Sequence, residues 1–163
     1  LAADKPLVVD ADALNLLAAQ PSSRVDWVLT PHPGEAARLL GVGVSEIQAD
    51  RFAAAHAIAQ KYGGVCILKG SGTLIAMSND QPLWLCDRGN PGLATGGSGD
   101  VLAGAIAALL AQGLAPIEAA RLGAWAHASA GDRVTAGGER GILAGDLLAP
   151  LRDVINSIVT HDD

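Results

Sequence analysis

Short, unbroken apolar runs alternate along the chain with longer segments in which apolar residues recur at helical spacing. The short runs predict buried strands, at residues 7–10, 26–31 and 65–70. Residues 73–87 contain two further apolar runs, and the polar pair Asn79–Asp80 between them predicts a hairpin turn.

The longer segments predict helices, at residues 13–20, 33–40, about 50–62, about 99–112, 115–136 and 145–159. Proline near the start of a helix and glycine just past its end mark the boundaries, as Pro33 and Gly41 do for the second segment. Asp146 is expected to cap the last helix.

Continuous apolar strands that alternate with helices are typical of an α/β fold. We therefore expect a mostly parallel sheet, covered by helices on both faces, with one antiparallel β-hairpin. The 163 residues are enough for one domain with a core, and because the sequence contains no linker, a single domain over residues 1–163 is predicted.

Composition and charge exclude some classes of function. The net charge is −6 and the sequence has no basic run, so nucleic acid is not an expected partner. No apolar stretch free of charges is long enough to span a membrane, and there is no signal peptide. Cys66 and Cys86 lack metal-ligand spacing, which predicts two buried, reduced thiols in a cytoplasmic protein. Because a strand opens the sequence almost at once, the chain is expected to begin inside a domain.

The segment "GNPGLATGGSGDVLAG", residues 89–104, places glycines directly before a predicted helix. The backbone amides of Gly97 to Asp100 would lie at the amino terminus of that helix, where free donors and the helix dipole bind anions, usually phosphate. Asp100 has two roles open to it: it either caps the helix or acts as a general base beside a bound phosphate. The segment is neither a Walker A loop nor a dinucleotide fingerprint.

The segment "LKGSGT" ends the strand at residues 65–70 and enters the hairpin. The charge of Lys69, the amides of the two glycines and the hydroxyl of Thr73 suit phosphate oxygens. The alternative is a hairpin entry with a solvated lysine. Together with the glycine segment, the phosphate interpretation is favoured.

Two other strand ends carry polar side chains. In "TPHPGE", prolines hold His32 rigidly, and Glu35 either reaches Mg²⁺ through water or favours the helix dipole. In "VVDADALN", Asp10, Asp12 and Asn15 could line a substrate or metal site, although Asp12 is expected to be a helix N-cap.

The histidines inside the predicted helices are expected to be structural or to lie on the surface, and the tryptophans are expected to pack against other parts of the protein. His56 and His127 lie within alanine-rich helices, and Trp27, Trp84 and Trp125 are assigned to the core or to contacts between subunits.

These stretches, in this order, resemble the nucleotide-dependent NAD(P)H-hydrate dehydratases, the carboxyl-terminal domain of the YjeF-type repair proteins. The resemblance runs from "DADALN" through "TPHPGEAARLLG", "KGSGT" and "GNPGLATGGSGDVLAG" to "GILAGDLL", nearly the whole chain. It implies a ribokinase-like three-layer α/β/α sandwich that lacks the amino-terminal part of the domain. It also implies repair of hydrated NADH and NADPH (NADHX and NADPHX), with ADP or ATP as co-substrate, Mg²⁺ as cofactor and a homotetrameric assembly.

By the same resemblance, the phosphates of the nucleotide are held by Lys69, Gly70, Ser71, Gly72 and Thr73, with Gly99 also contacting the nucleotide. His32 and Asp100 contact the hydrated cofactor, with Asp100 as the base, and Gly97, Ser98 and Gly99 form the anion hole. Glu35 is the candidate for reaching Mg²⁺ through water. Two alternatives stay open: a ribokinase-like kinase for a vitamin precursor or sugar, and an inactive nucleotide-binding fragment.

Overall fold

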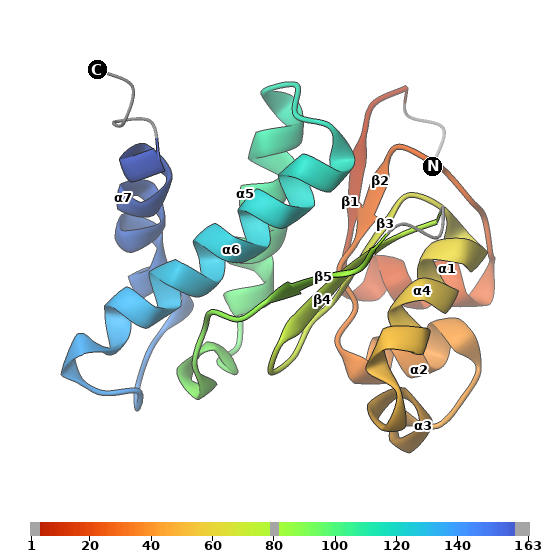
Figure 1. The fold of residues 1–163 in the computed structure, drawn as a ribbon, viewed down its shortest axis with the longest axis horizontal. Coiled ribbons are helices and arrows are strands. Elements are labelled where there is room, and N and C mark those ends of the chain that lie inside the picture. The colour runs from red at the N-terminus through yellow and green to blue at the C-terminus, as the bar shows by residue number, and fades with distance from the viewer. Residues whose placement is uncertain (1–3, 79–81, 159–163) are drawn as a thin grey trace.

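The computed structural model describes residues 4–78 and 82–158 (Figure 1). The helices are α1 (Asp12–Ala19), α2 (Pro33–Leu40), α3 (Val44–Ala49), α4 (Arg51–Tyr62), α5 (Ser98–Ala111), α6 (Pro116–Val134) and α7 (Leu148–Ile158). The strands are β1 (Leu7–Val9), β2 (Trp27–Leu29), β3 (Val65–Leu68), β4 (Thr73–Met77) and β5 (Trp84–Cys86). Short 3₁₀ turns lie at Pro91–Leu93, Thr135–Gly137 and Ala144–Leu147.

One five-stranded sheet runs in the order β1-β2-β3-β4-β5. The first three strands are parallel, and β3-β4 and β4-β5 are antiparallel, so the expected sheet with an added hairpin is confirmed. The turn predicted at Asn79–Asp80 lies outside the described residues.

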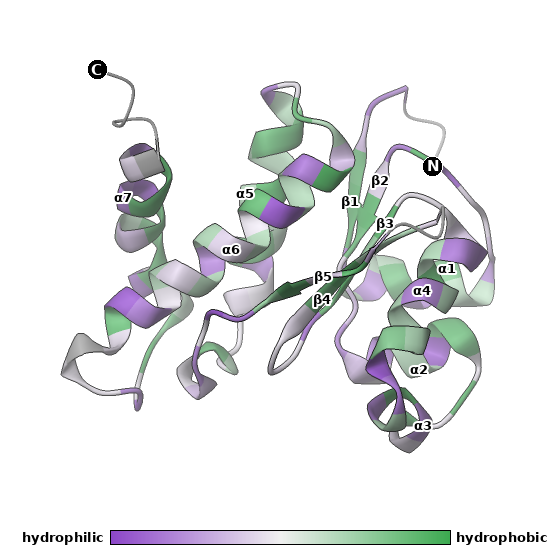
Figure 2. Ribbon diagram, viewed as in Figure 1, coloured by the Kyte–Doolittle hydropathy of each residue, from purple (hydrophilic) through white to green (hydrophobic). Residues whose placement is uncertain are grey.

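Helices cover both faces of this sheet (Figure 1). One core cluster joins the sheet to α1, α2, α3 and α4, and it includes the fully buried Trp27 and Tyr62. A second cluster joins the opposite face to α5 and α6, centred on Ile67 and Ile106. Figure 2 shows the strands in the hydrophobic colour, between helices whose outer surfaces are more polar. The three-layer α/β/α sandwich is therefore confirmed.

Two local predictions need correction, and one helix lies where none was predicted. The N-cap of α1 is Ala11, which adopts a left-handed φ of +50°, so the chain turns one residue before Asp12. Residues 44–49 form a helix of their own before α4. Asp146 lies inside a 3₁₀ turn, where its carboxylate accepts a hydrogen bond from the Leu143 amide, so it is not the cap of α7.

Within the described residues, no helix is both long enough and apolar enough to cross a membrane. Both cysteines are free and buried, as expected, and burial raises the pKa of each thiol. Trp125 is partly exposed on α6, and Trp84 on β5 lies beneath the Arg121 guanidinium, 5.0 Å from the ring centre.

Candidate active site

The carboxyl ends of the three parallel strands bring Asp10, His32 and Lys69 to one edge of the sheet. The Lys69 amide donates to the Pro31 carbonyl at 2.9 Å, which ties the end of β3 to the loop after β2. Ligands of open α/β sheets bind at such an edge. Three of the stretches singled out in the sequence therefore meet at one place.

Lys69 is not a solvated lysine. Its Nζ lies 3.0 Å from Asp10 Oδ1 and 3.9 Å from Glu35 Oε2, and its side chain is 21% exposed. Asp10 and Glu35 therefore hold the ammonium group in a fixed position at the end of β3. The alternative of a solvated hairpin entry is wrong.

His32 and Glu35 cap α2 together. His32 Nδ1 accepts from the amides of Gly34 and Glu35 at 2.9 and 3.3 Å, and the Glu35 carboxylate accepts from the His32 amide at 2.8 Å. Because Nδ1 is an acceptor, the neutral imidazole carries its proton on Nε2. His32 Nε2 lies 3.5 Å from Glu35 Oε1.

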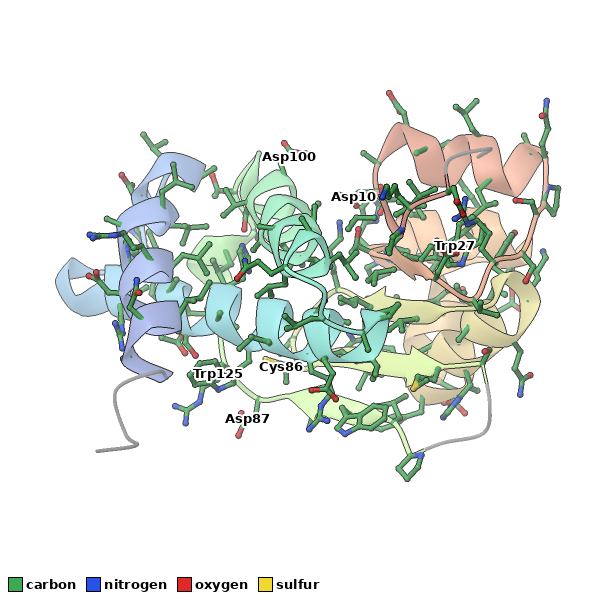
Figure 3. All side chains as sticks on the ribbon, turned by 90° about the horizontal axis from the view of Figure 1, so that it is seen from above. Asp10, Trp27, Cys86, Asp87, Asp100 and Trp125 are labelled. Atoms are coloured by element: carbon green, nitrogen blue, oxygen red, sulfur yellow. The ribbon has the colours of Figure 1, made fainter. Side chains whose placement is uncertain are left out.

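The amino terminus of α5 lies directly beside this lysine. An atom built at the Cβ position of Gly99 would be 3.4 Å from Lys69 Nζ and 3.7 Å from Asp10 Oδ2. Figure 3 shows Asp10 between α5 and the segment that begins α1. The glycine segment and "LKGSGT" therefore converge, as the phosphate interpretation requires.

The cap of α5 is Gly97, with a left-handed φ of +86° and no side-chain hydrogen bond to it among the described residues. The Ser98 amide already donates to the Thr95 carbonyl at 3.3 Å, so the amides of Gly99 and Asp100 are the more open donors. The Asp100 side chain is exposed and points outward in Figure 3, outside the lining of the main cavity. Since Gly97 occupies the cap position, Asp100 is not the helix cap.

A cavity of about 700 Å³ opens in front of these groups. Its polar wall contains His32, Lys69, the turn at residues 70–73, Ser98 and Gly99. Its apolar wall contains Leu93, Leu102, Ala124 and Ala128. A cavity lined by a lysine, by several glycines and by apolar side chains suits a nucleotide.

Sequence reasoning missed His127, which was assigned a structural or surface role. It is buried on α6, lines the cavity, and its Nε2 lies 3.1 Å from Ser98 Oγ. Burial holds the pKa of His127 below its ordinary value; a hydrogen bond with the backbone of Ser98 partly opposes this, and the positive charge of Lys69 adds to the lowering. The imidazole is therefore neutral at neutral pH. The only feature of the sequence that could have drawn attention to His127 is its position among the small residues of "AHASAGD".

Two further residues were missed. Asp132 on α6 accepts from the Gly89 amide at 3.0 Å and from Asn90 Nδ2 at 3.2 Å, and so anchors the loop that forms one cavity wall. Arg51, the first residue of α4, donates to three carbonyls around the "KGSG" turn. A cation at a helix amino terminus opposes the helix dipole, and this was the signal that could have drawn attention to Arg51.

No cluster of three or more metal-ligating side chains is found in the part of the chain that the structure describes. Asp10 and Glu35 are nevertheless close to the lysine at the anion site. Mg²⁺ commonly binds one or two carboxylates, water and substrate phosphates, without a cage of protein ligands. The donor set therefore fits a magnesium ion that arrives with a nucleotide.

Comparison with known proteins settles the family. The sequence model of the NAD(P)H-hydrate dehydratase family matches residues 1–152. The chain belongs to this family. The bifunctional NAD(P)H-hydrate repair enzyme Nnr of Coxiella burnetii is 54% identical over 157 residues, which are 96% of this chain and 32% of that protein.

Two more relatives agree. The ADP-dependent (S)-NAD(P)H-hydrate dehydratase of Neisseria meningitidis is 48% identical over 95% of this chain and 55% of its own length. The crystal structure of the ADP/ATP-dependent NAD(P)H-hydrate dehydratase of Bacillus subtilis, co-crystallised with ATP and Mg²⁺, superposes with a TM-score of 0.83 at 34% identity, over 96% of this chain and 56% of that one. The fold expected from the resemblance is confirmed. The chain spans about a third of the length of its bifunctional relatives.

Proposed function

We propose that this chain forms the nucleotide-binding and catalytic part of an ADP-dependent NAD(P)H-hydrate dehydratase. The observation that carries the proposal is the approach of the α5 amino terminus to Lys69, with 3.4 Å between Lys69 Nζ and the Cβ position of Gly99. Open amides, a helix dipole and an ammonium group at one point form an anion site for phosphate.

In this proposal the nucleotide lies along the cavity. Its phosphates contact Lys69 and the turn at residues 70–73, and they approach Gly99. The base and ribose occupy the apolar end, where the small side chains of Ala124 and Ala128 leave room for a flat ring. The hydrated cofactor approaches from the side of His32 and Asp100.

The proposed reaction is phosphoryl transfer followed by elimination. The hydroxyl oxygen of the hydrated nicotinamide ring forms a bond to the terminal phosphorus of ADP, the bond to AMP breaks, and Asp100 accepts the hydroxyl proton. The amides of the Gly97–Gly99 segment stabilise the charge on the transferring group. Phosphate then leaves with the electrons of the carbon–oxygen bond as the neighbouring carbon loses a proton, which restores the double bond. The products are NAD(P)H, AMP and phosphate.

Mg²⁺ is proposed as the ion that accompanies the nucleotide. When bound, it neutralises phosphate charge during transfer. Glu35, and Asp10 beside it, would hold the ion through water, because both carboxylates already contact Lys69. A homotetramer in the cytoplasm is proposed from the family resemblance, and the partly exposed Trp125 and exposed Leu85 are apolar surface consistent with an interface.

The test is recovery of NADH absorbance when the full-length protein that contains this chain receives hydrated NADH, ADP and Mg²⁺. We expect recovery by the wild type and loss of at least a hundredfold in rate for Asp100→Asn, with ADP binding retained. Unchanged turnover in Asp100→Asn would remove Asp100 as the base. Turnover of a vitamin precursor or sugar hydroxyl without NADH recovery would instead identify a ribokinase-like kinase.

A further inference from the structure

The carbonyls of Leu68, Lys69 and Ser71, in and beside the "KGSG" turn, face Arg51, which is not part of the cavity lining. Its Nη1 donates to the Ser71 carbonyl at 2.5 Å, and its Nη2 lies 3.3 and 3.4 Å from the carbonyls of Leu68 and Lys69. The remaining carbonyl, that of Gly70, accepts from Thr73 Oγ1 at 3.1 Å. Four successive carbonyls are therefore bound by side chains of the protein itself.

This arrangement fixes the direction of the amides. In a peptide unit the N–H points opposite to the C=O. The N–H groups of Gly70 and Gly72 belong to the same peptide units as the Lys69 and Ser71 carbonyls, so both point away from Arg51. Gly70 and Gly72 line the cavity, whereas Arg51 does not. Backbone amides that face a concavity are donors for a bound anion.

We propose that Arg51 is a positioning residue for the nucleotide: by binding the carbonyls of the turn, it presents the amides of Gly70 and Gly72 to the phosphates. The proposal rests on the proposed nucleotide site.

Two features indicate that Arg51 is not placed for stability. Its Nε is buried with no hydrogen-bond partner within the described residues, which costs free energy. Its charge also lies at the amino terminus of α4, where a cation is unfavourable. Gly70 is needed for the same contact, because a Cβ there would lie 2.8 Å from Arg51 Nη2.

The experiment measures ADP and adenosine binding by calorimetry in the full-length protein. R51A is expected to weaken ADP binding roughly 10- to 100-fold, as the loss of several hydrogen bonds to a charged group implies, and to change adenosine binding less than twofold. R51K is expected to fall between R51A and the wild type, because one ammonium group cannot bridge three carbonyls. The matched control is R38A, which removes an exposed arginine whose Nη1 donates to Asn15 Oδ1 on α1.

Millimolar guanidinium chloride should restore ADP binding to R51A, and an equal concentration of ammonium chloride should not. A lower melting temperature with unchanged ADP affinity in R51A and R51K would overturn the proposal and leave Arg51 a structural clamp. Equal losses for ADP and adenosine would overturn it as well. Absence of ADP binding by the wild type would overturn the proposed nucleotide site itself, an outcome distinct from equal affinities in wild type and variant.

Discussion

Lys69 is the charge around which the site is organised. Lys69 Nζ lies within 3.9 Å of a carboxylate oxygen of both Asp10 and Glu35. It is also the side-chain atom nearest to the Cβ position of Gly99. A phosphate in the cavity would therefore share the ammonium group with two carboxylates. The position of the lysine is set before any ligand arrives, and this lowers the entropy cost of binding.

Replacing Lys69 by methionine should weaken ADP binding about 10- to 100-fold, because a charge-assisted contact to phosphate is lost. Calorimetry with ADP provides the measurement. Lys61→Met is the matched control: that lysine donates to the Leu39 carbonyl at 2.7 Å, and it does not line the cavity. Equal ADP affinity in Lys69→Met and the wild type would remove Lys69 from the site.

The lowered pKa of His127 predicts that the free energy of unfolding depends on pH. Its pKa in the folded chain is lower than the ordinary 6.5. Between these two values the unfolded chain binds more protons than the folded one, so the free energy of unfolding falls as pH decreases below about 6.5. The contribution of His127 to this loss of stability is complete once the pH lies below the pKa of His127 in the folded chain.

Denaturant unfolding at pH 7.5 and at pH 5.5 tests this. The loss of stability between the two pH values should be smaller in His127→Gln than in the wild type, by at most about 1.4 kcal/mol for each unit of pKa shift. His56→Gln, a substitution on α4 outside the cavity, controls for the loss of a histidine. An identical pH dependence in wild type and His127→Gln would contradict the prediction.

At the residue scale, the predicted site residues that line the cavity belong to short local motifs. Lys69, the turn at residues 70–73, His32 and Gly99 were singled out by residue type and position, and all of them line the cavity. Arg51, His127 and Asp132 were missed, because their partners are distant in sequence. The Ser98–His127 contact, for example, joins α5 to α6 across 29 positions.

The proposed anion site lies at the first turn of helix α5, and the rest of the helix serves packing. Gly99 and Gly104 both lie in this helix, yet a Cβ at Gly99 would approach Lys69 and Asp10, while one at Gly104 would meet no atom within 4 Å. Of these two glycines, only Gly99 therefore has close neighbours at its Cβ position. Substituting alanine at each of the two positions therefore distinguishes an effect on ligand binding from an effect on helix propensity.

Gly104→Ala should stabilise the protein by about 0.5–1 kcal/mol and leave ADP binding unchanged, because alanine reduces the entropy of the unfolded chain. Gly99→Ala should reduce ADP affinity by at least tenfold, since its methyl group would occupy space beside the ammonium group. Thermal unfolding and calorimetry on both variants provide the comparison. Full ADP affinity in Gly99→Ala would show that phosphate does not approach this turn.

Element boundaries were predicted well where glycine or proline marks them. Pro33 begins α2, and Gly41, in the left-handed conformation, ends it. Predictions failed where the backbone changed conformation without such a residue. Ala11 takes the left-handed φ that starts α1, and a 3₁₀ turn precedes α7, so neither Asp12 nor Asp146 is a cap.

For the whole molecule, the alternation of strands and helices was sufficient to predict a mostly parallel sheet with helices on both faces, because each apolar run has to be covered on both faces. The two core clusters fulfil that requirement on opposite sides of one sheet. The proposed ligand could not follow from the pattern of elements, because one fold hosts many activities. The proposal depends on the few side chains that meet at the strand ends and on the family to which the chain belongs.

The cavity proposed for the nucleotide is lined by residues of this chain, but the Asp100 side chain points outward, and β1 has a hydrogen-bonded neighbour only in β2 among the described residues. The pocket for the hydrated cofactor would then need residues other than these 163. This is consistent with the length of the bifunctional relatives, of which the chain spans about a third. We expect the isolated chain to bind ADP and to restore no NADH, while the full-length protein does both. Calorimetry and NADH absorbance on the two proteins, with Lys69→Met as the binding-deficient control, make the measurement. NADH recovery by the isolated chain would place the whole substrate site within these residues.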